Sequence, residues 1–236
     1  DVSVDYLKFL STILNVNLKM NMPYVSFDGS VIFWSDKYFT KITNILYPEK
    51  NSIDYKNIYN INYNKDCFMG IRLLDNNTHT NFDVFVGHIK SGENSISELK
   101  RVNSITTMLE FINDVSLKNR VICIDSNTSY LYQKQMKLGD VFDKQSNLIG
   151  KLSEYVTEIW ENYKYTNIIS QNKDTMCWKM RAGSQQVHKN GELMADTIDA
   201  ILIPNNINST PYYPYSSDIT QPEYKNILKW RTDTNI

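Results

Sequence analysis

The stretch RVICIDSNTSY, residues 120–130, has the pattern of a buried strand that ends abruptly on polar side chains. Its apolar or small residues, 121–124, run directly into Asp125, Ser126 and Asn127. A short apolar run bounded by turn residues indicates a buried strand. Two interpretations account for the polar end. Asp, Ser and Asn bond to the nearby backbone in turns, whereas α/β enzymes place catalytic groups beyond the carboxyl ends of strands. The rest of the chain decides between them.

Strand-like and helix-like segments precede this stretch in a regular order. Residues 67–74 and 82–89 predict two strands, joined by a polar connection at residues 75–81. Residues 96–114 predict an amphipathic helix, because apolar side chains recur on one of its faces. That face comprises Leu99, Val102, Ile105, Met108, Leu109 and Ile112. The sequence therefore predicts a strand, a helix and then the strand that ends at residues 125–127.

The remaining segments indicate a layered α/β domain. Residues 4–14 and 150–165 have apolar side chains near helical spacing, and residues 197–204 predict a strand. Asp28-Gly29 is a strong signal for a two-residue turn between two strand-like runs. Residues 205–236 are rich in Pro, Tyr, Ser and Asn and predict mostly irregular structure. Hairpins with interspersed helices favour mixed sheets covered by helices, in an α/β or α+β arrangement.

Composition narrows the class of protein. A length of 236 residues with 42% hydrophobic content fits a single domain, residues 1–236, with a sizeable core. The net charge of −1 gives no global basic field to attract nucleic acid over long distances. No apolar run approaches the roughly 18 to 20 residues that a membrane helix needs. Three cysteines far apart in the sequence, Cys67, Cys123 and Cys177, favour reduced thiols and hence a cytoplasmic location.

Five stretches occur in an order that resembles the endonuclease/exonuclease/phosphatase superfamily, the fold of deoxyribonuclease I and the apurinic endonucleases. The deadenylase and nocturnin branch is the most similar in its motifs. The stretches are FDGSVIFW (27–34), VFVGHIKSGENSISELKR (84–101), VICIDSN (121–127), TMCWKMR (175–181) and ADTIDAILI (195–203). The resemblance covers nearly the whole chain and implies a four-layer sandwich, in which two mixed β-sheets are flanked by helices.

The resemblance implies catalytic roles for four residues. Asp125 would orient or deprotonate the attacking water, and Asn127 would bond the phosphate. Because side chains two apart on a strand point to the same face, these two can cooperate at the strand end. His88 would contact the phosphate region, and Asp199 would orient a catalytic histidine as in an Asp–His pair. Without the resemblance, His88 is an ordinary structural histidine and Asp199 a surface aspartate.

The same resemblance implies a set of substrate-binding residues. Lys179 and Arg181 are two apart and suited to phosphate contacts, although a solvated basic stretch is the alternative interpretation. Trp178 would stack on a base, unless it belongs to the core. Arg101, which by default is a solvent-facing helix residue, would also contact substrate.

A divalent cation, Mg²⁺ or Mn²⁺, is part of the chemistry that the resemblance implies. The family's Glu ligand lies near the N-terminus, where Asp1 takes its position in this chain, and Asp125 would be a second ligand. The family's Ser-Asp-His motif is missing, because Ser217-Asp218 is followed by Ile219. We therefore expect the 236 residues to be a fragment without the first strand and the Ser-Asp-His segment. The alternative is a protein that has lost catalysis.

These inferences predict a magnesium-dependent phosphodiesterase that hydrolyses RNA. Removal of poly(A) from single-stranded RNA in the 3′-to-5′ direction is the leading version. Two alternatives stay open. One is a nocturnin-like 2′-phosphatase that acts on a phosphorylated nicotinamide dinucleotide, and the other is an inactive RNA-binding or partner-binding module on the same fold.

Overall fold

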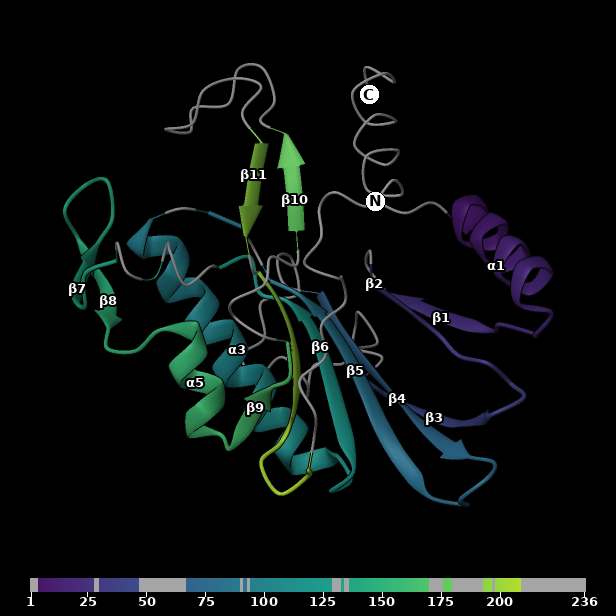
Figure 1. Ribbon diagram of the computed structural model, residues 1–236. Coiled ribbons are helices and arrows are strands. Elements are labelled where there is room, and N and C mark those ends of the chain that lie inside the picture. Colours follow the sequence, from purple (N-terminus) through teal and green to yellow (C-terminus); the bar gives the residue numbers. More distant parts are fainter. Residues whose placement is uncertain are drawn as a thin grey trace, which may run out of the picture.

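A mixed six-stranded sheet organises the chain in the computed structural model (Figure 1). The structure describes residues 4–27, 30–46, 67–89, 91–92, 94–128, 133, 136–169, 176–179, 193–196 and 198–208. The sheet has the order β3-β4-β5-β6-β12-β9. Its strands are β3 (Phe39–Leu46), β4 (Cys67–Asp75), β5 (Asn81–His88), β6 (Arg120–Asp125), β12 (Asp199–Pro204) and β9 (Tyr165–Asn167).

Among the described residues, three two-stranded pairs accompany the large sheet. They are β1 (Tyr24–Phe27) with β2 (Ser30–Phe33), β7 (Gly139–Phe142) with β8 (Leu148–Leu152), and β10 (Met176–Lys179) with β11 (Leu193–Asp196). The helices are α1 (Val4–Leu18), α3 (Ser95–Val115) and α5 (Val156–Asn162). In the described part of the chain, no helix has the length and apolar character needed to cross a membrane.

The long helix α3 connects the two parallel strands of the sheet, β5 and β6. Parallel strands need such a crossover, since a hairpin can join only antiparallel ones. The helix begins where the Asn94 side chain accepts a hydrogen bond of 2.9 Å from the backbone N–H of Ser97, which satisfies a donor that a helix start leaves unpaired. The predicted apolar face is confirmed, because all six of its residues are buried.

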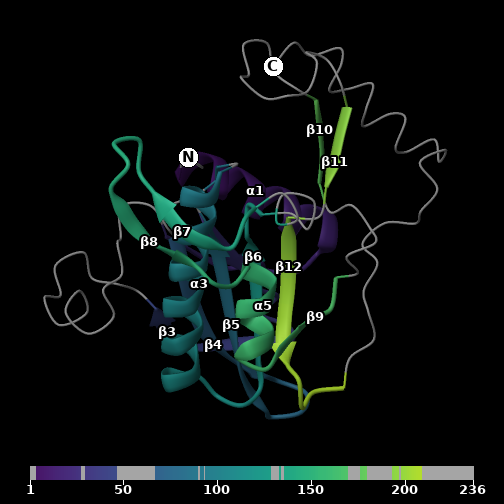
Figure 2. The same cartoon turned by 90° about the vertical axis from the view of Figure 1, so that its left-hand side faces the viewer.

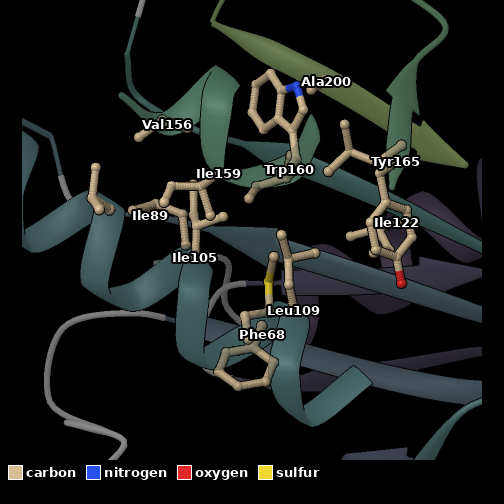
Figure 3. Packing of buried hydrophobic residues seen from close by; sticks show 14 of the residues in the cluster. Phe68, Ile89, Ile105, Leu109, Ile122, Val156, Ile159, Trp160, Tyr165 and Ala200 are labelled. Atoms are coloured by element: carbon tan, nitrogen blue, oxygen red, sulfur yellow. The ribbon is translucent and has the colours of Figure 1, made fainter. Parts of the chain in front are cut away.

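Helices α3 and α5 cover one face of the large sheet, as Figure 2 shows. Side chains from both helices and from the sheet form the larger hydrophobic cluster of the described residues (Figure 3). Phe85 and Ile122 contribute from the strands, Ile105 and Leu109 from α3, and Trp160 from α5. Each large apolar side chain buried in this way stabilises the fold by about 1.5–3 kcal/mol.

The opposite face of the sheet carries a second apolar layer. Ile32 of β2 and Trp34, which follows β2, cluster with Met69, Ile71 and Leu73 of β4. Helix α1 lies beside the β1–β2 hairpin (Figure 1), and Ser11 Oγ donates to the carbonyl of Met22, 3.0 Å away, in the segment that joins α1 to β1. The order is helices, large sheet, hairpin, helix. The predicted four-layer α/β fold is thus confirmed, with the second sheet represented by two described strands.

Local predictions mostly match the observed elements, with one clear error. The pairing of Phe27 with Ser30 leaves two residues between β1 and β2, as the Asp-Gly signal predicts. A single helix over residues 150–165 is wrong, because Leu148–Leu152 forms strand β8 and the helix begins only at Val156. The segment instead pairs with β7, and the backbone of Gly150 lies close against the side chain of Leu99 in α3.

The close contact between Gly70 and Phe85 generates a prediction about stability. These residues pair directly in β4 and β5, and a methyl group at Gly70 would overlap the buried ring of Phe85. We expect Gly70→Ala to lower the free energy of unfolding in urea by about 1–3 kcal/mol, the usual cost of overpacking. The control is Gly87→Ala, whose methyl group would lie 3.5 Å from its nearest neighbours. Equal stability of the two variants would contradict the prediction.

Candidate active site

Three adjacent strands place polar residues side by side at one end of the sheet. His88 ends β5 and pairs in parallel register with Asp125, which ends β6. Asp199 begins β12 and pairs in antiparallel register with the same Asp125. Directly paired residues point to the same face, with Cβ atoms about 4.5–5.5 Å apart in an antiparallel pair. His88, Asp125 and Asp199 therefore form a row at this end of the sheet, which we call the catalytic row after the role that the sequence predicts for these residues.

The catalytic row faces away from α3 and α5. Ile124 and Ala200, which precede Asp125 and follow Asp199, pack in the cluster beneath these helices. A methyl group added at Gly87, which precedes His88, would lie 3.5 Å from the sulfur of Met108 in α3. Successive side chains alternate between the two faces of a strand. The row therefore stands on the side of the β1–β2 layer.

His88 and Asp125 form the ion pair of the row. Nε2 of His88 lies 3.7 Å from Oδ2 of Asp125, and the two side chains are 62% and 35% exposed. This separation is too long for a direct hydrogen bond but close enough for a protonated imidazole to stabilise the carboxylate. Both groups are thus accessible to a ligand at the open end of the sheet.

The environment of Asp125 makes its carboxylate more basic than usual. Burial raises its pKa, although the backbone N–H of Asn127 and the nearby His88 act in the opposite direction. The Asn127 N–H donates to Oδ1 of Asp125 over 3.0 Å. A carboxylate with a raised pKa is a stronger proton acceptor, which is the property that a general base requires.

Asn127 lies beyond the end of β6, so the period of a strand does not determine its direction. Its φ of 49° is left-handed, a conformation that Asn tolerates better than most residues. The side-chain amide donates to the carbonyl of Ile89 over 2.6 Å, and the N–H of Ile89 donates to the carbonyl of Asp125 over 2.9 Å. Since an Asn amide carries two N–H donors, the bond to Ile89 uses one of them.

Ser126 ties the same loop to the segment before β12. It is buried, and both its N–H and its hydroxyl donate to the carbonyl of Ile198, at 2.9 and 2.6 Å. Asp125 and Asn127 on either side of it are consequently fixed relative to Asp199. The polar end of β6 thus makes the local hydrogen bonds of a turn. Its Asp125 also stands in the row, as the catalytic interpretation requires.

Arg101 occupies a different place from the one expected of a substrate-binding residue. Its side chain is fully buried, and its Nε and Nη2 donate to Oε2 of Glu98 over 3.0 and 2.7 Å. Helix α3 also lies on the face of the sheet away from the catalytic row. From this position the guanidinium cannot touch a ligand at the row.

The other residues expected to bind substrate or metal lie at the margin of the described structure. Trp178 and Lys179 belong to β10, where they pair with Met194 and Leu193 of β11. Strand β11 ends three residues before Asp199, so this hairpin extends from the end of the sheet that carries the row (Figure 1). Asp1 and Arg181 lie outside the described residues.

Two of the three residues in the catalytic row are carboxylates, which are ligands that a hard cation such as Mg²⁺ accepts. Mg²⁺ prefers oxygen ligands and is often held by one or two carboxylates together with water and substrate phosphates. Asp125 and Asp199, directly opposite each other, supply two such carboxylates. Among the described residues, no three His, Cys, Asp or Glu side chains gather as a metal-binding group.

Glu98 and Thr128 belong to the surroundings of the site and were not predicted from the sequence. Both are buried, and Thr128 Oγ1 donates to Glu98 Oε2 over 2.9 Å. A signal was present: Glu98 precedes Arg101 by one turn and Val102 by four residues, so both charged residues lie on the apolar face of the helix. Charged groups on that face predict a buried ion pair, not solvent contact.

Comparisons with known proteins find similarity at the level of structure. No family model and no curated protein sequence matches the chain. Similar solved structures include D. rerio TDP2 with a single-strand DNA product, at 11% identity and a TM-score of 0.48, covering 89% of this chain and 72% of that one. The human nocturnin catalytic domain shows 12% identity and a TM-score of 0.47, with 84% and 65% covered.

A third similar structure is an endonuclease/exonuclease/phosphatase family protein from Bacteroides thetaiotaomicron, at 11% identity and a TM-score of 0.48. The aligned parts cover 83% of this chain and 65% of that protein. The chain thus spans 65% to 72% of the length of the three structures. The chemistry of the site follows from the chain's own residues.

The environment of Asp125 predicts how the carboxylate titrates. Measured by carbon NMR, its pKa should lie above the ordinary value for an aspartate, about 3.9. The pKa of Asp143 should lie below that value, because the side chain and backbone of Asn147 donate to it. His88→Ala should raise the pKa of Asp125 further, since it removes a group that favours the ionised carboxylate. A lowered pKa for Asp125 in the unaltered protein would contradict this account.

Proposed function

We propose that the protein is a divalent-metal-dependent phosphodiesterase that hydrolyses RNA, with 3′-to-5′ removal of poly(A) as its main reaction. The observation that supports this most is the catalytic row, because His88, Asp125 and Asp199 come from three separate motifs and meet on adjacent strands. The order of the five motifs supports the same proposal. Single-stranded RNA would be the physiological partner.

Asp125 is the proton acceptor in the proposed reaction. Its carboxylate takes a proton from a water molecule as the water oxygen forms a bond to phosphorus. The bond from phosphorus to the leaving ribose oxygen breaks, and that oxygen takes a proton from solvent. Burial helps this step, because it raises the pKa of Asp125 and so its affinity for the proton.

The other residues near the row hold the phosphate and its charge. A protonated His88 contributes positive charge beside Asp125 at the exposed end of the strands. Asn127 offers the amide N–H that Ile89 does not use. Lys179 and Arg181 would bind neighbouring phosphates, and Trp178 would stack on a base. Phosphate contacts of this kind position the strand without reading its sequence.

Mg²⁺ or Mn²⁺ would be held by Asp125, with Asp1 as a further ligand, and Asp199 would orient a catalytic histidine. The bound cation supplies neutralisation of the negative charge that develops on the phosphate. The antiparallel pairing keeps Asp125 and Asp199 side by side, and their combined negative charge would attract the cation. Removal of the metal by a chelator should accordingly stop hydrolysis.

Hydrolysis of a 2′-phosphate on a nicotinamide dinucleotide is the second candidate function. It needs the same proton acceptor and the same phosphate contacts, and Trp178 and Lys179 would serve a dinucleotide as readily as RNA. The two functions differ in the product, which is adenosine monophosphate in the first and inorganic phosphate in the second. An inactive module that binds RNA or another partner would give neither product.

The proposal predicts the effect of replacing the proton acceptor. With Mg²⁺ or Mn²⁺, Asp125→Asn should hydrolyse labelled oligoadenylate about 10²- to 10⁴-fold more slowly than the unaltered protein, the usual contribution of a general base. Asp140→Asn is the matched control, because Asp140 is an exposed aspartate of β7. Its rate should be unchanged. Release of phosphate from the phosphorylated dinucleotide, with oligoadenylate left intact, would favour the 2′-phosphatase instead. Absence of both products would contradict both functions.

A further inference from the structure

A buried ion pair lies behind the catalytic row, on the helix side of the sheet. Glu98 and Arg101 are each fully buried and bond through Nε and Nη2 of the arginine. Taking two charges out of water is costly, and such a pair persists only where further hydrogen bonds satisfy its remaining donors and acceptors. The partners that supply these bonds show what the pair holds in place.

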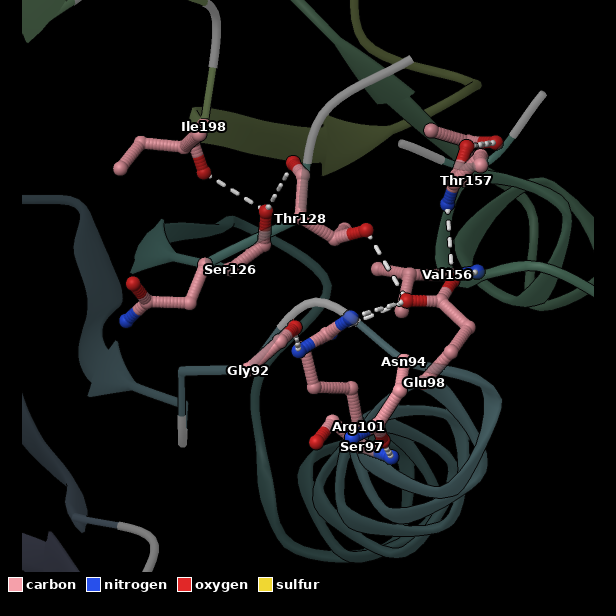
Figure 4. Close-up of polar contacts among 12 residues, drawn as sticks. Gly92, Asn94, Ser97, Glu98, Arg101, Ser126, Thr128, Val156, Thr157 and Ile198 are labelled. Carbon is pink, nitrogen blue, oxygen red and sulfur yellow. Dashed lines mark hydrogen bonds and ion pairs between the residues drawn. The ribbon is translucent and has the colours of Figure 1, made fainter. Parts of the chain in front are cut away.

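The hydrogen bonds of this pair reach the loops that follow strands β5 and β6 (Figure 4). Nη1 of Arg101 donates to the carbonyl of Gly92 over 2.6 Å, four residues after His88. Oε2 of Glu98 accepts a hydrogen bond of 2.9 Å from Thr128, the residue after Asn127. The first loop is thus held by the arginine and the second by the glutamate.

The second oxygen of Glu98 extends these contacts to two more segments. Oε1 accepts hydrogen bonds from Nε2 of Gln133 at 3.2 Å and from the backbone N–H of Val156 at 3.4 Å. Val156 is the first residue of α5. The Glu98 carboxylate therefore bonds to Arg101 within α3, to Thr128 after β6, to Gln133 and to the start of α5.

We propose that Glu98 and Arg101 are positioning residues for the catalytic row. The pair fixes Thr128 and Gly92, and through them the backbone on which Asp125, Asn127 and His88 stand. A buried ion pair is weak support for stability, since apolar residues of similar size often serve as well. Its directional bonds, in contrast, set the places of two loops. The kinetic part of this proposal depends on the proposed function, whereas the structural part does not.

The chain contains a matched control for this pair. Arg72 donates through Nε and Nη2 to Asp83 over 2.8 and 3.0 Å, and the Asp83 side chain is likewise fully buried. Asp83 also accepts a hydrogen bond of 2.7 Å from the backbone N–H of Leu117. The pair lies toward the other end of β5, five residues and about 17 Å from His88. It has the same chemistry, and within the described part of the chain its hydrogen bonds reach Leu117 and none of the loops beside the row.

Hydrogen exchange of backbone amides in the full chain tests the structural part without any substrate. Thr128→Val keeps the shape of the side chain but removes its bond to Glu98. The amides of Ser126 and Asn127 should then exchange about tenfold faster, the effect of losing one hydrogen bond to a charged group. In Asp83→Asn only the amide of Leu117 and its neighbours should exchange faster.

Kinetics on oligoadenylate test the positioning role itself. In Thr128→Val and Glu98→Gln, kcat should fall about ten- to a hundredfold, because small displacements of catalytic groups have effects of this size. KM should change less than about twofold, since the pair does not touch substrate. Thr128→Ser restores the hydroxyl and should restore kcat. Asp83→Asn should leave kcat unchanged even where its loss of stability in urea equals that of Glu98→Gln.

Each outcome decides one of the two proposals. Unchanged exchange at Ser126 and Asn127 in Thr128→Val overturns the positioning role, whatever the activity. A fall in kcat that follows stability alone, and is equal in Asp83→Asn, also overturns it. Faster exchange in a protein that hydrolyses none of the substrates overturns the proposed function and leaves the positioning of the loops supported. If Glu98→Gln does not fold, Thr128→Val and Thr128→Ser still decide.

Discussion

The parallel pairing of β5 and β6 is the constraint on which the rest of the structure depends. It places the carboxyl ends of both strands at the same end of the sheet, so that His88 and Asp125 stand opposite each other. The antiparallel β12 then brings Asp199 to the same place from the beginning of its own strand. Because a parallel pair needs a long crossover, the same constraint requires a helix with the length and apolar face of α3.

Helix α3 serves two purposes that compete for the same face. Its middle and end bury apolar side chains against the sheet, whereas its first two turns bury Glu98 and Arg101. The apolar contacts stabilise the fold in proportion to the area removed from water. The charged contacts add little net stability but specify geometry, because each of their hydrogen bonds has a fixed direction. The two turns of α3 that contain Glu98 and Arg101 lie where the loops of the proposed site approach the helix.

Periodicity in the sequence predicts the elements well and the loops poorly. The strands around residues 67–89 and the apolar face of α3 follow from alternation and helical spacing, because burial of one face dominates their free energy. Asn127 was expected to share a face with Asp125 by strand spacing, but it lies beyond the strand end with a left-handed backbone, and its side chain donates to Ile89. Such long-range bonds leave no local pattern. Strand β8 was predicted as part of a helix, whereas it pairs with β7 and its Gly150 lies against Leu99 of α3, so contacts outside the segment decide its conformation.

The two-sided burial of β5 has a consequence for changes in chain length. Val84 and Val86 pack toward the β1–β2 layer, whereas Phe85 belongs to the core beneath the helices. Insertion or deletion of one residue between Phe85 and His88 would move every later side chain of the strand to the opposite face, and the imidazole would point toward α3. Two added residues would restore the face but carry His88 about 7 Å past Asp125. Substitutions along this strand are therefore far less disruptive to the row than any change in the number of its residues.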